Sequence, residues 1–452
     1  MRAIALSAGQ EMLWFLSRLA PDSRAYNVVL AVRVRTPLDW EVLDHAVATL
    51  ASRHEALRTV YDEVDGRPRG TVLPESPVRV RALDAVPERI LDLVAAAGAE
   101  PLRLEAGEPF RVVLFRLAAA DAVLVLVAHH IGCDATSIWL LMRDLLAGCA
   151  GVPPGRVYLP PSSYAEDERA VLASPRREEL EAFWSSRCAG VSPAELPADR
   201  PRPEQPGYNG ATVVVHVPAP ARIREVARAL KVTPFSLLLG TFQALLRRST
   251  GLDEFVVGCP VSTRKSARLR ETVGNLINTL VLRSVFAPST TFADAALSAQ
   301  EQVRTGLSHV DFPLSLLSPS VGIRPPRIAF TLLATDRLEP PLPMVAAGAA
   351  EGAEVTWHGL RLALVDAPHL EAQFDLNAEA RWGRDSLSIA FRYDVELFDA
   401  GTIRTFADRY LTMLASAAGD PGARVDAAGL LGDTELAQLL ALGTAPPRIE
   451  PV

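Results

Sequence analysis

The chain has 452 residues, of which 49% are hydrophobic and 22% charged, and it carries a formal net charge of −7 with a pI near 5.7. This composition is typical of a globular protein, and the length suits two lobes of roughly two hundred residues each better than one core. No stripe of lysine or arginine recurs along the chain, which disfavours nucleic acid as a partner.

Cysteine usage and apolar runs indicate a reduced, cytoplasmic protein. The four cysteines lie far apart and include no C-x-x-C pair, so neither a disulfide framework nor a zinc site is expected. The longest aliphatic run, residues 122–128, is far too short to span a membrane, and the N-terminus has no apolar signal region. We therefore expect no membrane partner.

The first half of the chain alternates helical and extended patterns. Apolar residues recur at helical spacing over 7–19 and over 40–54, where Asp39 is a suitable cap, and they alternate over 28–35. Further strands are expected near 58–62, 78–83 and 111–117. The run 122–127 is aliphatic without alternation, which predicts a central strand covered on both faces.

A loop over 129–135 should lead into a helix at about 137–146, after which prolines break the pattern. We place the first lobe at 1–175 and the second at 176–452, with an extended proline-rich segment at 196–207 and a linker-like tail from 430. The second lobe is again mixed. Its expected strands are 211–217, 255–260, 280–284, 327–333, 374–380 and 386–393, and its expected helices are 223–230, 233–248, 291–309 and 399–418.

Titratable side chains are most concentrated in the loop after the expected central strand, where His129 and His130 precede Asp134. An imidazole there could act as a base or hydrogen-bonding group near neutral pH. An equally weighted alternative is structural: the histidines end the strand and Asp134 caps the next helix. A metal site is disfavoured, because adjacent histidines seldom converge on one ion and no third ligand lies nearby in sequence.

This loop also carries a family resemblance. The pattern His129-His130-x-x-x-Asp134 resembles the HHxxxDG signature of the condensation domains of nonribosomal peptide synthetases. Further blocks are similar to that family in order and spacing, which together form a specific signal. They are residues 7–14, 53–59, 196–203, 257–264, 273–283 and 309–314.

The resemblance implies an α/β fold of two chloramphenicol-acetyltransferase-like lobes arranged in a V with an interlobe tunnel, the second lobe carrying a floor loop and a latch. It implies transfer of an aminoacyl or acyl thioester to an amine or alcohol, forming an amide or ester. It implies no permanently bound cofactor, since the donor arrives on the 4′-phosphopantetheine arm of a peptidyl carrier protein. The acceptor would be a small molecule or carrier-bound.

Carried over by motif, His130 is the expected catalytic residue, which orients the acceptor nucleophile and takes its proton. Asp134 is expected to pair with Arg58 and hold the loop in shape, while His129 packs or bonds locally. Asp134→Ala should then lower stability as well as rate.

Three further residues are expected to line the substrate channel. Gly132 and Ala135 belong to the motif, and Asn278 lies in the expected floor-loop block, where its amide could equally satisfy loop backbone. Ala135 stands where the family signature has glycine, at a position where positive φ is favoured, so it bears on acceptor choice.

Two other functions stay open: a condensation-like domain that recruits partner enzymes without catalysis, and an acyltransferase that uses a coenzyme A thioester. The intact histidine pair disfavours the heterocyclization branch of the family, and Ile138 after Ser137 disfavours the epimerization branch. Met1 directly precedes the first block and the chain ends shortly after Leu431, so a free-standing enzyme is the simpler expectation, although an excised N-terminal domain would look the same.

Overall fold

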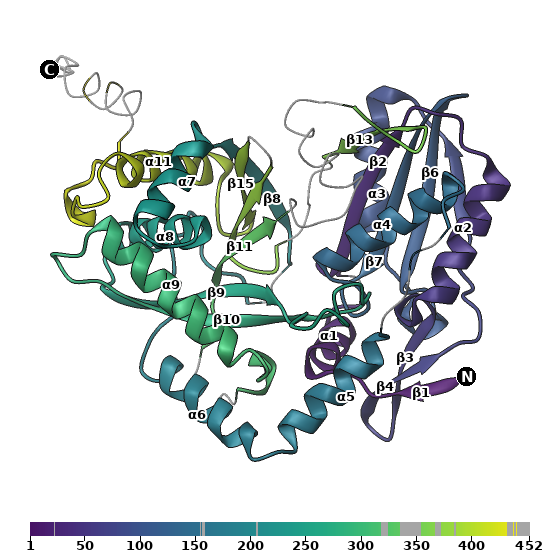
Figure 1. Ribbon diagram of the computed structural model, residues 1–452, viewed down its shortest axis with the longest axis horizontal. Coiled ribbons are helices and arrows are strands. Elements are labelled where there is room, and N and C mark those ends of the chain that lie inside the picture. Colours follow the sequence, from purple (N-terminus) through teal and green to yellow (C-terminus); the bar gives the residue numbers. More distant parts are fainter. Residues whose placement is uncertain are drawn as a thin grey trace, which may run out of the picture.

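A computed structural model describes residues 1–21, 23–153, 155, 159–204, 207–317, 324–334, 354–366, 372–383, 386–431, 437 and 440. It has two lobes, each built on a six-stranded sheet, and a three-stranded sheet beside the first lobe (Figure 1). Helices and strands alternate in both lobes, which confirms the predicted two-lobed α/β class. The linker-like tail falls largely outside the described residues.

The sheet of the first lobe has the order β12-β13-β2-β7-β6-β5. Its strands are β2 (Asn27–Val34), β5 (Val80–Asp84), β6 (Phe110–Ala118), β7 (Asp121–His129), β12 (Val355–Trp357) and β13 (Leu360–Val365). Helices α2 (Trp40–Arg53) and α4 (Ala135–Cys149) pack on one face, and α3 (Ile90–Ala99) packs on the other. Residues 122–129 are all buried, so β7 is the central, doubly covered strand that its sequence predicts.

Helix α1 (Ala8–Leu19) and the small sheet close one end of the first lobe. The small sheet has the order β1-β4-β3, with β1 (Arg2–Ile4), β3 (Thr59–Val64) and β4 (Arg67–Val72). Ser7 and Gln10 form a capping box at the start of α1, each side chain accepting from the other residue's backbone N–H. This capping chemistry is one physical reason for the opening sequence block.

The sheet of the second lobe has the order β10-β9-β11-β14-β15-β8. Its strands are β8 (Gly210–His216), β9 (Glu254–Ser262), β10 (Ile277–Val285), β11 (Ile328–Ala334), β14 (Leu376–Trp382) and β15 (Leu387–Asp394). Helices α7 (Pro220–Ala229), α8 (Pro234–Thr250), α9 (Phe292–Ser308) and α11 (Ala400–Gly419) share its main hydrophobic core. Tyr410 of α11 meets Phe242 of α8 and Phe391 of the sheet there.

Among the described residues, the chain links the lobes along α5 (Pro161–Leu172) and α6 (Arg176–Cys188) and again at β12 and β13. Helices α5 and α6 run along the base between the lobes (Figure 1). Farther along the chain, β12 and β13 cross back and add to β2, so residues 355–365 belong to the sheet of the first lobe although the sequence boundary put 176–452 in the second. His358 and Gly359 have φ of 44° and 82°, a two-residue turn that suits a tight hairpin.

Most predicted elements are present with shifted ends. Helix α4 begins at Ala135, two residues before the predicted start, and Asp39 caps α2 as expected. Helices α3, α5 and α6 and strands β1, β4, β12 and β13 were not predicted from the sequence. Among the described residues no single helix is long and apolar enough to cross a membrane, and α7 and α8 pass that test only when joined across a 97° bend.

Candidate active site

The histidine loop, residues 129–134, leaves the end of the central strand β7 and is tied to two other segments. The backbone N–H of His130 donates to the Tyr26 carbonyl at 2.6 Å. Gln10 Nε2 donates to the Ile131 carbonyl at 2.9 Å, which links the loop to the start of α1. A short loop fixed at a rigid strand and at a helix end is well suited to hold a side chain in one position.

His129 bonds within the loop. Its side chain is buried, and its Nδ1 accepts from the backbone N–H of Ile131 at 3.1 Å. Burial, with a smaller contribution from the adjacent His130, lowers the pKa of His129 to about 3. His129 is therefore neutral at neutral pH and lies outside the residues that line the cavity described below.

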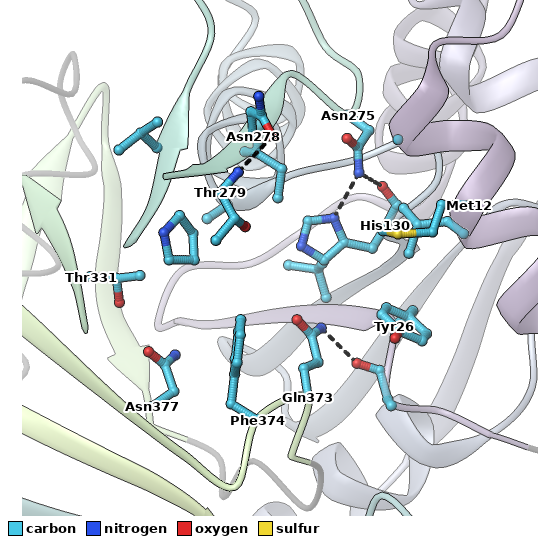
Figure 2. A pocket seen from close by; sticks show the side chains of 18 of the residues that line it. Met12, Tyr26, His130, Asn275, Asn278, Thr279, Thr331, Gln373, Phe374 and Asn377 are labelled. Atoms are coloured by element: carbon cyan, nitrogen blue, oxygen red, sulfur yellow. Dashed lines mark hydrogen bonds between the residues drawn. The ribbon is translucent and has the colours of Figure 1, made fainter. Parts of the chain in front are cut away.

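His130 projects into a cavity between the lobes (Figure 2). Nδ2 of Asn275 lies 3.2 Å from Nδ1 of His130 and donates to the His130 carbonyl at 2.8 Å. Burial lowers the pKa of His130, and the negative charge of Asp134 and the ring's contact with its own backbone offset this only in part. The imidazole is therefore neutral at neutral pH.

Asp134 is fully buried and joins the two halves of the chain. Its carboxylate accepts from Arg264 Nη1 at 2.6 Å and Nη2 at 3.0 Å, from Ser137 N at 2.8 Å and from Leu276 N at 2.9 Å. Burial alone would raise the pKa of Asp134, but Arg264 and the two backbone donors outweigh it and hold the pKa below its ordinary value. The bond from Ser137 caps α4 as predicted.

The expected pairing of Asp134 with Arg58 is wrong. Arg58 lies in the short helical turn before β3, where its guanidinium donates to the Leu73 carbonyl instead. Arg264 takes the predicted place, although it is 130 residues away in sequence and comes from the second half of the chain. The supporting role of Asp134 thus becomes a link between lobes instead of a contact within one lobe.

The three expected channel residues lie in different surroundings. Ala135 lines the cavity, but it is a helical residue in the first turn of α4 and does not have the positive φ expected there. Gly132 is buried, and a side chain at its Cα would meet Ala56 and Tyr61, so it does not face the cavity. Asn278 lines the cavity while its Nδ2 donates to the carbonyls of residues 310 and 312.

The cavity has a volume of about 700 Å³ and is walled by both lobes. Met12, Tyr26 and Ala135 contribute from the first lobe, and Met12 and Tyr26 lie near His130 (Figure 2). Ile277, Thr279, Leu314, Leu317, Thr331, Phe374 and Asn377 contribute from the second lobe. Its size is in the range of small-molecule sites, and its mostly apolar walls favour exclusion of water around the imidazole.

The wall opposite His130 is polar. Thr331 on β11 and Asn377 on β14 face the cavity from adjacent strands (Figure 2). Within the described part of the chain, Thr331 Oγ1 and Asn377 Oδ1 are buried and have no hydrogen-bond partner. Beside them, Glu379 accepts from Arg381 and Arg392, so this charged group is neutralised within the sheet.

Two residues that hold the site, Arg264 and Asn275, were not predicted from the sequence. Arg264 ends the block 257–264, and Asn275 lies within the block 273–283, so both stand in motifs that were recognised without a role being assigned to these positions. Segment 272–276 docks directly on the histidine loop, where Gly274 also bonds Ser137 in both directions. The sequence feature that could have identified Arg264 and Asn275 is that each is a polar residue within a motif block far from the histidine loop.

Comparison with known proteins agrees with this arrangement. The model of the condensation domain family matches residues 1–440. Phosphinothricin tripeptide synthetase PhsC from Streptomyces viridochromogenes is 31% identical over 96% of this chain and 41% of its own length. Isonitrile lipopeptide synthase from Mycobacterium tuberculosis is 30% identical over 97% of this chain and 18% of its own length, so the chain spans less than half of both relatives.

Solved structures share the fold across nearly the whole chain. The X-domain from teicoplanin biosynthesis, solved in complex with OxyB, superposes with a TM-score of 0.82 at 25% identity, over 96% of this chain and 97% of the other. SgcC5 from Streptomyces globisporus gives a TM-score of 0.77 at 26% identity, over 93% and 100% of the two chains.

Two six-stranded lobes that enclose a histidine-bearing cavity define the chloramphenicol-acetyltransferase-like architecture. With a family model that covers 1–440, the chain belongs to the condensation domain family of nonribosomal peptide synthetases. The family forms amide bonds between substrates held on carrier proteins by phosphopantetheine arms.

Proposed function

We propose that this chain is a condensation enzyme of nonribosomal peptide-type biosynthesis, which transfers an aminoacyl or acyl group from the phosphopantetheine arm of a peptidyl carrier protein to an amine or alcohol acceptor. The observation that carries this proposal is the placement of His130, which projects from a loop fixed by both lobes into a cavity of about 700 Å³. A fixed, neutral imidazole in an enclosed space is suited to acyl transfer.

The surroundings of His130 support a positioned reaction. Met12 and Ala135 supply apolar surface to the cavity on the first-lobe side, beside the polar groups that line its other parts. The Asp134–Arg264 pair and the bonds of Asn275 fix the loop against the second lobe. Because holding two reactants in line contributes several orders of magnitude in effective concentration, a rigid junction of this kind serves the proposed reaction.

The proposal is tested by reconstitution. Candidate carrier proteins are loaded with aminoacyl groups, mixed with amine and alcohol acceptors, and the acylated product is followed by mass spectrometry. We expect His130→Ala to lose product formation by about a hundredfold or more. His129→Asn, which keeps an acceptor for the loop outside the cavity, should retain it. Full activity of His130→Ala would remove this residue from the mechanism.

A second candidate is a recruitment domain that performs no chemistry. The likeness to the X-domain that was solved in complex with OxyB favours it. The same reconstitution separates the two functions, because a recruitment domain would give no acyl transfer from any loaded carrier. In that case, product formation by the complete set of pathway enzymes would still depend on this chain and would be unchanged by His130→Ala.

A further inference from the structure

The cavity wall opposite His130 carries polar side chains on two adjacent, parallel strands, β11 and β14. Successive side chains of a strand point to opposite faces of its sheet. Phe330 of β11 and Ala378 of β14 belong to the main core of the second lobe. Their neighbours Thr331 and Asn377 therefore point to the other face, where both line the cavity. Figure 2 shows these two residues across the cavity from His130.

One oxygen atom on each of these side chains lacks a hydrogen-bond partner. Among the described residues, neither Thr331 Oγ1 nor Asn377 Oδ1 is hydrogen-bonded, although both atoms are buried. Most buried polar side-chain atoms are hydrogen-bonded, because an unpaired one has given up its bonds to water without replacement. Two unpaired oxygens on neighbouring strands of one cavity wall point to a partner that arrives with a bound molecule.

Rotation of the two side chains brings their polar groups to such a molecule. The hydroxyl and methyl groups of Thr331 are similar in size, so a turn about the Cα–Cβ bond exchanges them with little change in the shape of the wall. A turn of the Asn377 amide about the Cβ–Cγ bond exchanges its oxygen with its nitrogen. The hydroxyl both donates and accepts, and the amide presents either kind of group. The matching partner is a group that also donates and accepts, as a hydroxyl or a carboxamide does.

The charged groups beside this wall neutralise one another. Glu379 accepts from Arg381 and from Arg392. Arg381 also lies 3.5 Å from Asp366, so two carboxylates face two guanidinium groups within the described residues. A charged substrate group would lose its hydration here without meeting an uncompensated opposite charge. The wall is therefore suited to a polar group that carries no charge.

We propose that Thr331 and Asn377 form a specificity subsite for an uncharged polar side chain of the substrate, one that ends in a hydroxyl or a carboxamide. The subsite lies across the cavity from His130, so it holds this side chain without touching the reacting atoms. The inference rests on the proposed function, because it names the side-chain class of a substrate in that reaction. The side chain belongs to the acyl donor or to the acceptor, and the kinetic experiment below distinguishes these two sources.

Equilibrium binding tests the subsite without turnover. The probes are aminoacyl pantetheine analogues in which N–H replaces the thioester sulfur, and they carry threonyl, valyl, asparaginyl or leucyl groups. Calorimetry gives their dissociation constants. We expect the native protein to bind the threonyl probe about tenfold or more tightly than the valyl probe, or the asparaginyl probe than the leucyl probe. Equal affinity within both pairs, or no binding by any probe, overturns the inference.

Variants of the wall assign the preference to its residues. Thr331→Val and Asn377→Leu keep the approximate size of each side chain and remove its hydrogen-bonding groups, so each should lower the preference about tenfold. Thr212→Val is the matched control. Thr212 Oγ1 also lacks a partner among the described residues, but Thr212 lies outside the cavity, so the native preference should be kept. A preference that survives both wall substitutions contradicts the assignment.

Kinetics identify which substrate carries the polar group. In one arm, a carrier protein loaded with threonine or valine is given the same acceptor. In the other arm, a valyl-loaded carrier is given threonine amide or valine amide as acceptor. We expect the threonyl substrate to have the higher kcat/KM in one arm, and Thr331→Val to lower this ratio about tenfold in that arm alone. Transfer without a preference in either arm contradicts this inference, whereas selective binding of the probes without any transfer contradicts only the proposed function.

Discussion

Removing either partner of the Asp134–Arg264 ion pair is expected to lower the free energy of unfolding by about 3–5 kcal/mol. The side chain of Asp134 is 0% exposed and that of Arg264 is 6% exposed, so the remaining partner would keep a buried charge. Arg264 lowers the pKa of Asp134 against the effect of burial, so the carboxylate is charged at neutral pH. The cost is large because water cannot replace the lost partner.

A double-mutant cycle measures the pair. Asp134→Ala, Arg264→Met and the double variant are unfolded in urea and followed by tryptophan fluorescence. Since the second substitution removes a charge that the first left unpaired, the double variant should cost about 1–3 kcal/mol less than the sum of the single variants. The free energy of unfolding at acid pH gives a further check. Because the pKa of Asp134 is lowered in the folded protein, Asp134 stabilises the fold above its pKa in the unfolded chain, and this stabilisation is lost as the pH falls through its pKa in the folded protein.

Arg58 provides the matched control, because sequence resemblance assigned it to the same carboxylate. Its guanidinium bonds the Leu73 carbonyl, so Arg58→Met and Asp134→Ala should add within about 0.5 kcal/mol. Strong coupling of Asp134 to Arg58, or additivity with Arg264, would refute the assignment of the interlobe pair.

Three further outcomes are expected. Burial lowers the pKa of His129 to about 3, so the folded protein keeps this ring neutral while the unfolded chain protonates it below its pKa near 6.5. The free energy of unfolding should therefore fall by about 2 kcal/mol between roughly pH 7.5 and 5. In urea unfolding at a series of pH values, His129→Asn should lack this fall, and an equal fall in the variant would contradict the role given to His129. Ala135→Gly should cost under about 1 kcal/mol and widen the range of acceptors turned over, since its methyl group lines the cavity; a narrower range would argue against this. Thr331 lines the cavity with a hydroxyl that can bond a polar substrate group, so Thr331→Val should lower the ratio of kcat/KM for a threonyl substrate to that for a valyl substrate about tenfold. Thr212 lies on the same sheet face outside the cavity, so Thr212→Val should keep the native ratio. Equal ratios in both variants would rule out a role for Thr331.

The sequence by itself determined the central strand, the loop that follows it and the family. An unbroken aliphatic run can be buried on both faces only in the middle of a layered sheet, and β7 lies there. The cap of α4 also follows from local chemistry, since Asp134 and Ser137 are three residues apart. The order of motif blocks indicated two lobes without any coordinates.

Only the tertiary structure decided which side chains meet across the lobes. Hydrophobic periodicity indicates which residues are buried but does not identify a partner 130 residues away. The sequence therefore could not show that Asp134 pairs with Arg264 and not with Arg58. The same holds for Asn275, which meets His130 because segment 272–276 docks on the histidine loop. The crossing of β12 and β13 to β2 likewise depends on a sheet edge that exists only once the first lobe has folded.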